Sequence, residues 1–377
     1  MRVHILSLCL AANVAFADEI IGFSAYENGD YNTAYPHLIQ AANSGNAEAM
    51  YLIGRMYQYG YGVNQDAVKA GEWYRKAAEK DNPLAQLSLG FLYDSGNGFE
   101  QNYQEAFKWY LKSAQQGNAI AQRNLGLMYA TGDGVIKNDK NAFEWFKKSS
   151  EQGYAKAQVN LGYQYMTGEG VDKDVEKARY WYEKAAQQGD AKGEYSLGLL
   201  YSGEYGIERD DRAATYWFSR AANQGHRSAQ VYLAYQYMNG LGTERNPEKA
   251  AYWYHSAAEA GDDEAQVEYG QMLLAGLGLD KDYQKAAYWF GRSAAQGNVV
   301  AQGKLGYLYL AGLGVTKDNV KAYAWLKLSA TNKNEQAERE LNRLLPMLTQ
   351  QQLKEGEQLF NELKDKKPVI EDSSMEE

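Results

Sequence analysis

The chain contains 377 residues, 45% of them hydrophobic, and carries a formal net charge of −9 at pH 7. This length suits two or three ordinary domains or one long repeat array. The negative charge argues against a nucleic-acid-binding protein, because such proteins gather Lys and Arg against phosphates. It also disfavours membrane docking through diffuse charge, while a local basic site for a lipid or phosphoinositide headgroup stays open.

The first 17 residues have the pattern of a secretory signal peptide. Arg2 precedes an apolar run that starts at Ile5, and Ala15-Phe16-Ala17 supplies the small residues of a cleavage site. The alternative is a buried N-terminal helix. No later segment approaches the roughly 20 apolar residues that a membrane span needs. We therefore expect cleavage after Ala17 and export, either to the periplasm or out of the cell.

Cysteine chemistry is not expected in the exported chain. The only cysteine, Cys9, lies within the predicted signal peptide. After cleavage no thiol remains for a disulfide, a zinc–thiolate site or a nucleophile. The fold must therefore rest on packing alone.

Residues 18–46 resemble an incomplete copy of the repeat that follows them. Ala34 takes a position that is Ala in every later copy, whereas His37 stands where the later copies have Trp. We expect this segment to be an N-terminal capping half-repeat.

An internal repeat dominates the rest of the chain. An Ala precedes each Trp by three positions and a Gly precedes it by eleven. The Trp residues themselves lie 36 positions apart without a slip, at Trp73, Trp109, Trp145, Trp181, Trp217, Trp253, Trp289 and Trp325. This regularity predicts eight equal copies, numbered here repeats 1 to 8, at 47–82, 83–118, 119–154, 155–190, 191–226, 227–262, 263–298 and 299–334.

Repeat 4 illustrates the structure expected of each copy. Ala157, Leu161 and Tyr165 recur every fourth residue and predict one apolar face of a first helix. Gly168 tolerates a positive φ and predicts the end of that helix. Asp174, which is Asp or Asn in every copy, predicts the N-cap of a second helix. One such pair cannot bury its own apolar faces, so we expect the copies to stack with the Trp between neighbours.

The chain after the repeats is predicted to form a C-terminal cap. Residues 335–365 have the pattern of two helices, and Thr349 with Gln352 reads as a capping box at the start of the second. Residues 366–377 are charged and poor in apolar side chains, so we expect a disordered acidic tail.

The repeat resembles a known family. Repeat 4 contains Leu-Gly-x-x-Tyr from Leu161, a Gly-x-Gly-Val loop from Gly168, and Asp-x-x-Lys-Ala-x-x-Trp-Tyr-x-Lys-Ala-Ala-x-x-Gly from Asp174. This pattern is similar to the Sel1-like repeat, a relative of the tetratricopeptide repeat. The resemblance implies an all-α protein, a right-handed α-solenoid superhelix of helix-turn-helix repeats.

The resemblance also carries functional implications. Sel1-like repeats act chiefly as scaffolds for protein complexes, and exported bacterial members include proteins of host-cell entry, trafficking interference and immune-protein binding, which implies a virulence role. Cysteine-rich members associated with β-lactam binding or hydrolysis pair cysteines within their repeats. Because the mature sequence has no cysteine, we do not carry that activity over.

The sequence predicts no catalytic site, no cofactor and no metal site. After signal removal, His37, His226 and His255 fall in different copies without an acidic or Ser partner at a recurring spacing. The Gly-x-Gly loops lack the Lys-Ser/Thr of a P-loop and the closing Glu of a calcium loop. We expect these loops to end one helix and cap the next, and we expect a non-enzymatic protein.

The candidate binding surface lies on the first helices, which line the concave face in tetratricopeptide-like stacks. Their outward positions hold many aromatic and Met residues, whereas positions facing only water should favour Lys, Glu and Gln. The alternative is that these side chains pack between adjacent first helices. The predicted partner-binding residues are Tyr51, Phe91, Tyr163, Met166, Tyr195, Tyr235, Met238 and Tyr307.

Our leading functional hypothesis is an exported scaffold or adaptor that binds a partner protein on this concave face, as a bacterial host-interaction factor. The alternative is a periplasmic regulator or positioning factor for envelope enzymes or a secretion system. Lipid or phosphoinositide binding on the outer face is a lesser alternative, and a hydrolase lacks the residues it would need. We expect the chain to be a monomer.

Overall fold

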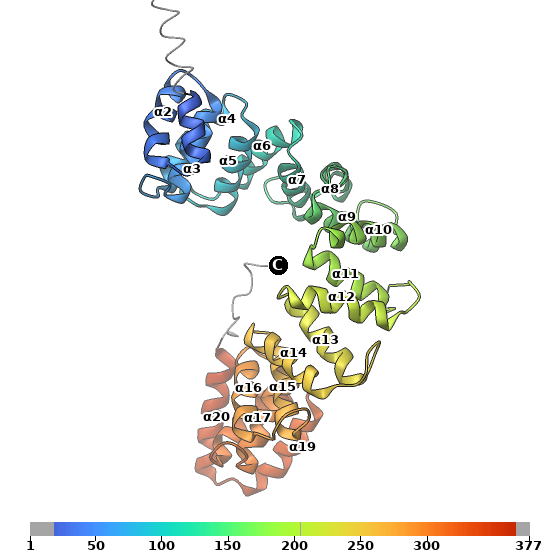
Figure 1. The fold of residues 1–377 in the computed structure, drawn as a ribbon. Coiled ribbons are helices and arrows are strands. Elements are labelled where there is room, and N and C mark those ends of the chain that lie inside the picture. The colour runs from blue at the N-terminus through green and yellow to red at the C-terminus, as the bar shows by residue number, and fades with distance from the viewer. Residues whose placement is uncertain (1–18, 204, 367–377) are drawn as a thin grey trace, which may run out of the picture. The chain divides into compact units, whose positions relative to one another are not determined.

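The computed structural model describes residues 19–203 and 205–366, and within these ranges every regular element is a helix. The predicted signal peptide and all but the first residue of the predicted tail lie outside the described residues. The helices form two compact units, with the boundary after Gln188 (Figure 1). Each unit is described separately below.

Unit 1 begins with a helical segment at residues 19–27 and continues through repeats 1 to 4. Its helices are α2 (Tyr31–Asn43), α3 (Ala47–Tyr59), α4 (Ala67–Ala78), α5 (Pro83–Ser95), α6 (Tyr103–Gln115), α7 (Ala119–Thr131), α8 (Asp139–Glu151), α9 (Ala155–Thr167) and α10 (Val175–Gln187).

Unit 2 contains repeats 5 to 8 and the C-terminal helices. Its elements are α11 (Ala191–Tyr201), α12 (Asp211–Asn223), α13 (Arg227–Asn239), α14 (Pro247–Glu259), α15 (Asp263–Ala275), α16 (Tyr283–Ala295), α17 (Val299–Ala311), α18 (Asn319–Thr331), α19 (Glu335–Leu344), the 3₁₀ turn η1 (Leu345–Met347) and α20 (Gln350–Asp365).

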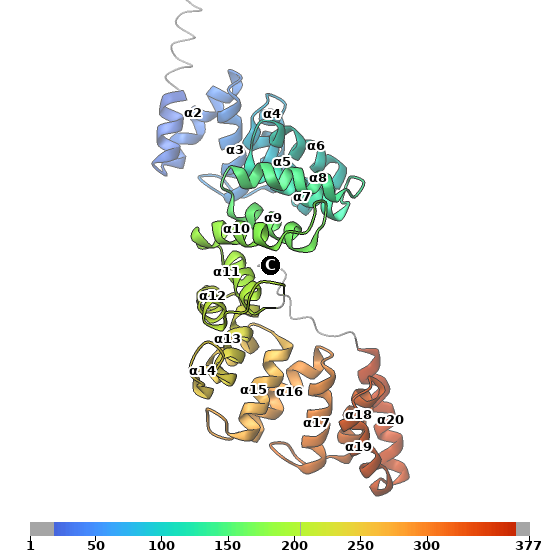
Figure 2. The ribbon, with the colours of Figure 1, turned by 90° about the vertical axis from the view of Figure 1, so that its right-hand side faces the viewer.

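Helix pairs stack in the order of the sequence. Each repeat contributes a first and a second helix that pack together, as α3 and α4 do, and within a unit the second helix also packs on the first helix of the next repeat. Figure 2 shows this succession for α14 to α18. The all-helical repeat fold predicted from the sequence is confirmed.

The predicted capping residues close the loops between the helices of a pair. All eight second helices start after the expected Asp or Asn, whose side chain accepts a backbone N–H of the first turn. In repeat 4, Asp174 Oδ1 accepts the N–H of Lys177 at 3.0 Å. Gly168 ends the first helix with φ +85°, a conformation that side chains with a Cβ rarely adopt.

A glycine on the first helix lies against an aromatic ring of the second helix. In repeat 4 a Cβ built on Gly162 would stand 2.6 and 2.7 Å from two ring carbons of Tyr182, which is buried. The same contact pairs a ring with a Gly in five other repeats: Tyr74 with Gly54, Tyr110 with Gly90, Phe146 with Gly126, Phe218 with Gly198, and Phe290 with Gly270. Repeat 6 has Ala234 at this position and repeat 8 pairs Gly306 with Leu326. The absence of a side chain on the first helix therefore lets the two helices approach within contact distance of the ring.

Several Trp residues pack toward the preceding repeat of the same unit. Trp181 of repeat 4 contacts a cluster that contains Ala142 and Phe143 of repeat 3. Trp289 of repeat 7 meets the imidazole of His255 in repeat 6, with ring centroids 5.7 Å apart. Because each ring is buried partly by its neighbour, a repeat depends on the adjacent copies for its own core.

A buried hydrogen-bond ladder also runs through the repeats, and the sequence pattern did not predict it. Gln158 on α9 donates its amide to the backbone oxygen of Ser150 at 3.3 Å and accepts from the Gln188 amide at 2.9 Å. Equivalent side-chain pairs, at 2.7–3.0 Å, are Gln116 with Gln86, Gln152 with Gln122, and Gln296 with Gln266. These bonds satisfy polar groups that would otherwise be costly to bury.

Repeat 5 carries a carboxylate at this position. Glu194 is fully buried, and its oxygens lie 2.7 Å from Arg220 Nη2 and 2.7 Å from the Gln224 amide nitrogen. Burial raises the pKa of Glu194 above its ordinary value, while Arg220 and the Gln224 hydrogen bond oppose this effect.

The C-terminal cap has the predicted helix start. The Thr349 hydroxyl accepts the backbone N–H of Gln352, and the Gln352 side chain accepts the backbone N–H of Thr349, which confirms the capping box. From there α20 runs along α18 (Figure 2). Phe360 of α20 packs on Ala324 and Leu328 of α18.

The glycine–ring contact makes opposite predictions for two Gly→Ala substitutions within helices. Gly162→Ala should lower the free energy of unfolding by about 1–3 kcal/mol, because the new Cβ overlaps the Tyr182 ring. In Gly291→Ala on α16, the new Cβ meets nothing within 4 Å. This substitution should raise the free energy of unfolding by about 0.5–1 kcal/mol, because Ala has a higher helix propensity than Gly. The check is the urea midpoint followed by far-UV circular dichroism. Equal effects of the two substitutions would contradict the contact.

Candidate interaction surface

Two of the predicted histidines, His226 and His255, serve local packing and capping. His226 caps α13, its Nδ1 accepting the N–H of Ala229 at 3.3 Å, and its ring stacks on Tyr195 with centroids 4.5 Å apart. His255 lies against Tyr269 and Trp289 and 3.4 Å from Glu259. Among residues 19–203 and 205–366, no group of three or more His, Cys, Asp and Glu side chains could hold a metal ion.

Four of the predicted binding residues form an exposed row on the first helices, called here the first-helix row. Each directly follows the small residue of its first helix, so its side chain points away from the ring of the second helix. Their exposed fractions are 49% for Phe91, 47% for Tyr163, 52% for Tyr235 and 43% for Tyr307. Phe91 and Tyr163 belong to unit 1, and Tyr235 and Tyr307 belong to unit 2.

The first-helix row is aromatic in every second repeat. The intervening repeats carry Leu127, Leu199 and Gln271 at the same position, and these side chains are half-buried. Within each unit, two large exposed rings are therefore separated by one repeat with a less exposed residue. Exposed aromatic side chains of this size are enriched at protein interfaces.

The two predicted methionines are half-buried beneath this surface. In repeat 4 the Met166 sulfur lies 3.9 Å from the Tyr182 hydroxyl, which donates to it. The equivalent residue in repeat 2, Asp94, accepts from the Tyr110 hydroxyl at 3.1 Å. Met238 packs against the main core cluster of unit 2. This position therefore serves the contact between the two helices of a repeat.

Tyr51 and Tyr195 have packing partners on neighbouring elements. The Tyr51 ring lies 5.7 Å from the Tyr74 ring, and burial raises the pKa of Tyr51. The Tyr195 ring stacks on His226 and lies 5.9 Å from Tyr232. Tyr195 thus contacts the next first helix, α13, whereas Tyr51 contacts the second helix of its own repeat.

A second set of exposed tyrosines lies on the second helices, and our sequence analysis did not single it out. These residues, called here the second-helix row, directly precede the Trp in four successive repeats. Each ring lies edge-on to that Trp, with the ring centroids 4.9–5.2 Å apart. The repeated Tyr-Trp pair is the signal that could have revealed them. Their exposed fractions are 50% for Tyr180, 54% for Tyr216, 66% for Tyr252 and 58% for Tyr288.

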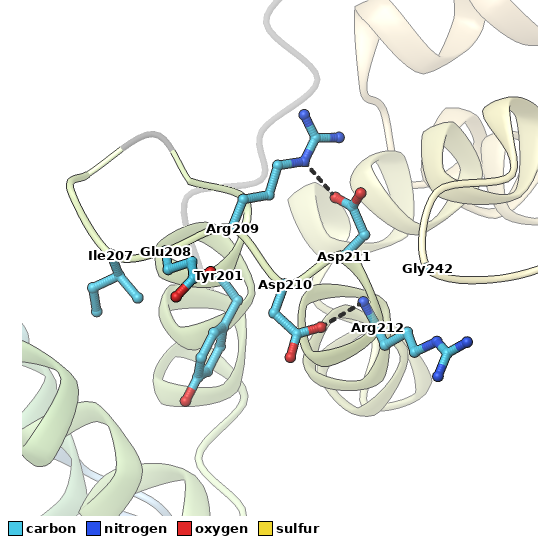
Figure 3. A pocket seen from close by; sticks show the side chains of 8 residues that line it. All are labelled: Tyr201, Ile207, Glu208, Arg209, Asp210, Asp211, Arg212 and Gly242. Atoms are coloured by element: carbon cyan, nitrogen blue, oxygen red, sulfur yellow. Dashed lines mark hydrogen bonds and ion pairs between the residues drawn. The ribbon is translucent and has the colours of Figure 1, made fainter.

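An open depression of about 610 Å³ lies beside the loop of repeat 5, with a lining that includes Tyr201 and Ile207 (Figure 3). Two of its charged side chains, Arg209 and Asp211, pair with each other. Arg209 Nε donates to Asp211 Oδ1 at 2.8 Å, and Asp210 caps α12 by accepting the N–H of Arg212 at 3.0 Å. The depression therefore holds capping and ion-pair contacts and no cluster suited to acid–base catalysis.

None of the described helices combines the length and the apolar composition that crossing a membrane requires.

Comparisons with known proteins agree with this architecture. The family model described as Sel1 repeat matches eight times, at residues 47–82, 83–118, 119–154, 155–190, 191–226, 227–262, 263–298 and 299–334. No curated protein matches the chain.

Two solved structures are similar in sequence as well as in fold. One is c5321, described as a protective antigen present in uropathogenic Escherichia coli strains and displaying an SLR fold; it is 31% identical over 94% of this chain and 85% of its own, with a TM-score of 0.56. The other is a Sel1 repeat protein from Oxalobacter formigenes, 36% identical over 64% of this chain and 96% of its own, with a TM-score of 0.60.

Proteins built from such repeats generally mediate protein–protein interactions, and the family is typically non-catalytic. The eight matched repeats and the similar structures establish that this chain belongs to the Sel1 repeat family.

Proposed function

We propose that this protein is an exported, non-catalytic scaffold that binds a partner protein through the first-helix row. The observation that carries the proposal is the exposure of an aromatic ring at the same repeat position in both units, at Phe91, Tyr163, Tyr235 and Tyr307. Tyr residues on a rigid support are frequent hot spots of protein interfaces. The helices beneath fix these rings in place before a partner arrives, which lowers the entropic cost of binding.

Host interaction is the partner class that we favour. The N-terminal sequence supports export, and the similar E. coli protein is described as a protective antigen of a uropathogen. An antigen that protects against infection is accessible to the immune system of the host. By analogy, we propose that this chain acts where it meets host proteins, and that its partner is one of them.

The binding proposal predicts a loss of affinity when the row is truncated within either unit. The double variants Phe91→Ala/Tyr163→Ala and Tyr235→Ala/Tyr307→Ala should each weaken binding of a purified partner by about 2 kcal/mol, roughly a 30-fold rise in Kd, if both units engage it. The partner is first isolated on the immobilised chain from host lysate and from envelope extract. Kd is then measured by titration calorimetry.

The matched controls are Tyr180→Ala in unit 1 and Tyr216→Ala in unit 2, which remove equally exposed tyrosines from the second helices. They should leave Kd within a factor of two. Circular dichroism confirms that all the variants are folded. If both folded double variants kept the original affinity, the first-helix row would not be the binding surface.

The export proposal predicts a defined mature N-terminus. When the full chain is produced in a bacterium, intact-mass spectrometry should find a protein that starts at Asp18, because cleavage follows Ala17. A chain that keeps Met1 or Arg2 in the cytoplasmic fraction would refute export. Retention of the processed chain in the periplasm would favour the envelope-regulator alternative over host interaction.

A further inference from the structure

The outer face of the second helices in unit 2 is aromatic and cationic near the C-terminal end. Tyr252 on α14 and Tyr288 on α16 are 66% and 58% exposed. Lys285, one turn before Tyr288, has a side chain that is 70% exposed, and Arg292, one turn after it, lies over the Trp289 ring at 5.2 Å. Helix α16 contains these two cations and no Asp or Glu, and its N-cap Asp282 lies 3.5 Å from the Lys285 ammonium.

In repeat 8, part of the chain itself covers the equivalent face. Ala324 of α18 occupies the position that is Tyr288 in α16, and it is fully buried under α20. Glu357 of α20 pairs with Lys327 of α18 and accepts the Tyr323 hydroxyl at 2.6 Å. The C-terminal region thus lies on the outer face of a second helix through apolar contacts and a carboxylate–lysine pair (Figure 2).

The sequence beyond α20 has the composition to continue this contact. Residues 367–377, KPVIEDSSMEE, lie outside the described residues and contain four acidic side chains after Pro368, together with Val369, Ile370 and Met375. Eleven residues can span up to about 36 Å when extended. Packed helices lie about 8–10 Å apart. The segment is therefore long enough to pass from the end of α20 over α16 to α14.

We propose that residues 367–377 bind across Tyr288 and Tyr252, on the outer face of α16 and α14. The apolar side chains of the segment contact the tyrosine rings, and its acidic side chains meet Lys285 and Arg292. The attraction centres on α16, because α14 also carries Glu248 and Glu259 besides Lys249 and His255. The segment thereby occupies this part of the second-helix row until a competing acidic ligand displaces it. This proposal involves a different face from the first-helix row and does not depend on it.

The test compares the full chain with a chain that ends at Lys366, which keeps every described residue. The probe is the synthetic peptide KPVIEDSSMEE, and its binding is measured by titration calorimetry at low salt. The shortened chain should bind the peptide at least tenfold more tightly than the full chain, because a tethered segment competes at an effective concentration of about millimolar. Higher salt should weaken binding, since charge attraction contributes.

Substitutions locate the site. In the shortened chain, Tyr252→Ala/Tyr288→Ala should weaken peptide binding at least fivefold, as should a peptide in which Gln and Asn replace the four acids. Tyr180→Ala, at the same repeat position in unit 1, is the matched control and should have no effect. Because the tyrosines are exposed, the double variant should fold, which circular dichroism verifies.

A footprint tests the contact in the full chain itself. Nitration of Tyr252 and Tyr288 by tetranitromethane, followed by peptide mass spectrometry, should be at least threefold slower in the full chain than in the shortened chain. Nitration of Tyr180 should be unchanged. The proposal is overturned if the peptide does not bind the shortened chain, if it binds both chains equally, or if the footprint does not change. A partner protein that binds the row without competing with the peptide would also overturn it.

Discussion

The structure depends on a contact between an aromatic ring on the second helix and a glycine on the first. In repeat 4 the Tyr182 ring rests where Gly162 has no side chain, and six of the eight repeats pair a ring with a glycine in this way. The ring is buried between two helices, so apolar burial and van der Waals contact hold them together without a disulfide. The Trp next to that ring then joins the repeat to the copy before it.

These two rings pack within a repeat and between repeats, and aromatic residues at other positions are exposed. The ring that follows the Trp is buried within its repeat, whereas the Tyr that precedes the Trp is exposed. On the first helix, the glycine faces the buried ring, so the next residue points outward. Regular spacing therefore generates regular rows on two faces, with no further structure needed to position them. A repeat fold of this kind provides wide, preorganised surfaces. Among its described residues, no group of three or more His, Cys, Asp and Glu side chains could hold a metal ion.

Much of the fold could be predicted from the sequence because its signals are local and repeated. The 36-residue spacing of Trp, the Asp or Asn caps and the glycines at helix ends act within one copy, and eight copies reinforce one another. The exposure of individual side chains was harder to predict. Tyr163 is exposed, whereas Tyr195, also on a first helix, is stacked on His226. That histidine lies at the N-cap of α13, the first helix of the next repeat.

The glutamine hydrogen-bond ladder and the position of α20 also could not be predicted from the local sequence pattern. A Gln that recurs in the first helices reads as an ordinary polar residue until its partner, 30 positions later, is known. The helix α20 packs on α18 because Ala324 and Leu328 replace the exposed Tyr288 and the half-buried Arg292 that α16 has at those positions. Such contacts join residues that are distant in sequence, and a single sequence gives no direct signal for them.

The central claim is that each repeat forms its core jointly with its neighbours through the buried rings. Native-state hydrogen exchange of the Phe290→Ala variant tests it most directly, because Phe290 lies in a cluster shared by repeats 6, 7 and 8. We expect faster exchange in α15 and α16, a smaller increase in α14 and α17, and unchanged exchange in α5 to α8 of unit 1. Acceleration confined to α16, or equal acceleration in every helix, would contradict the claim.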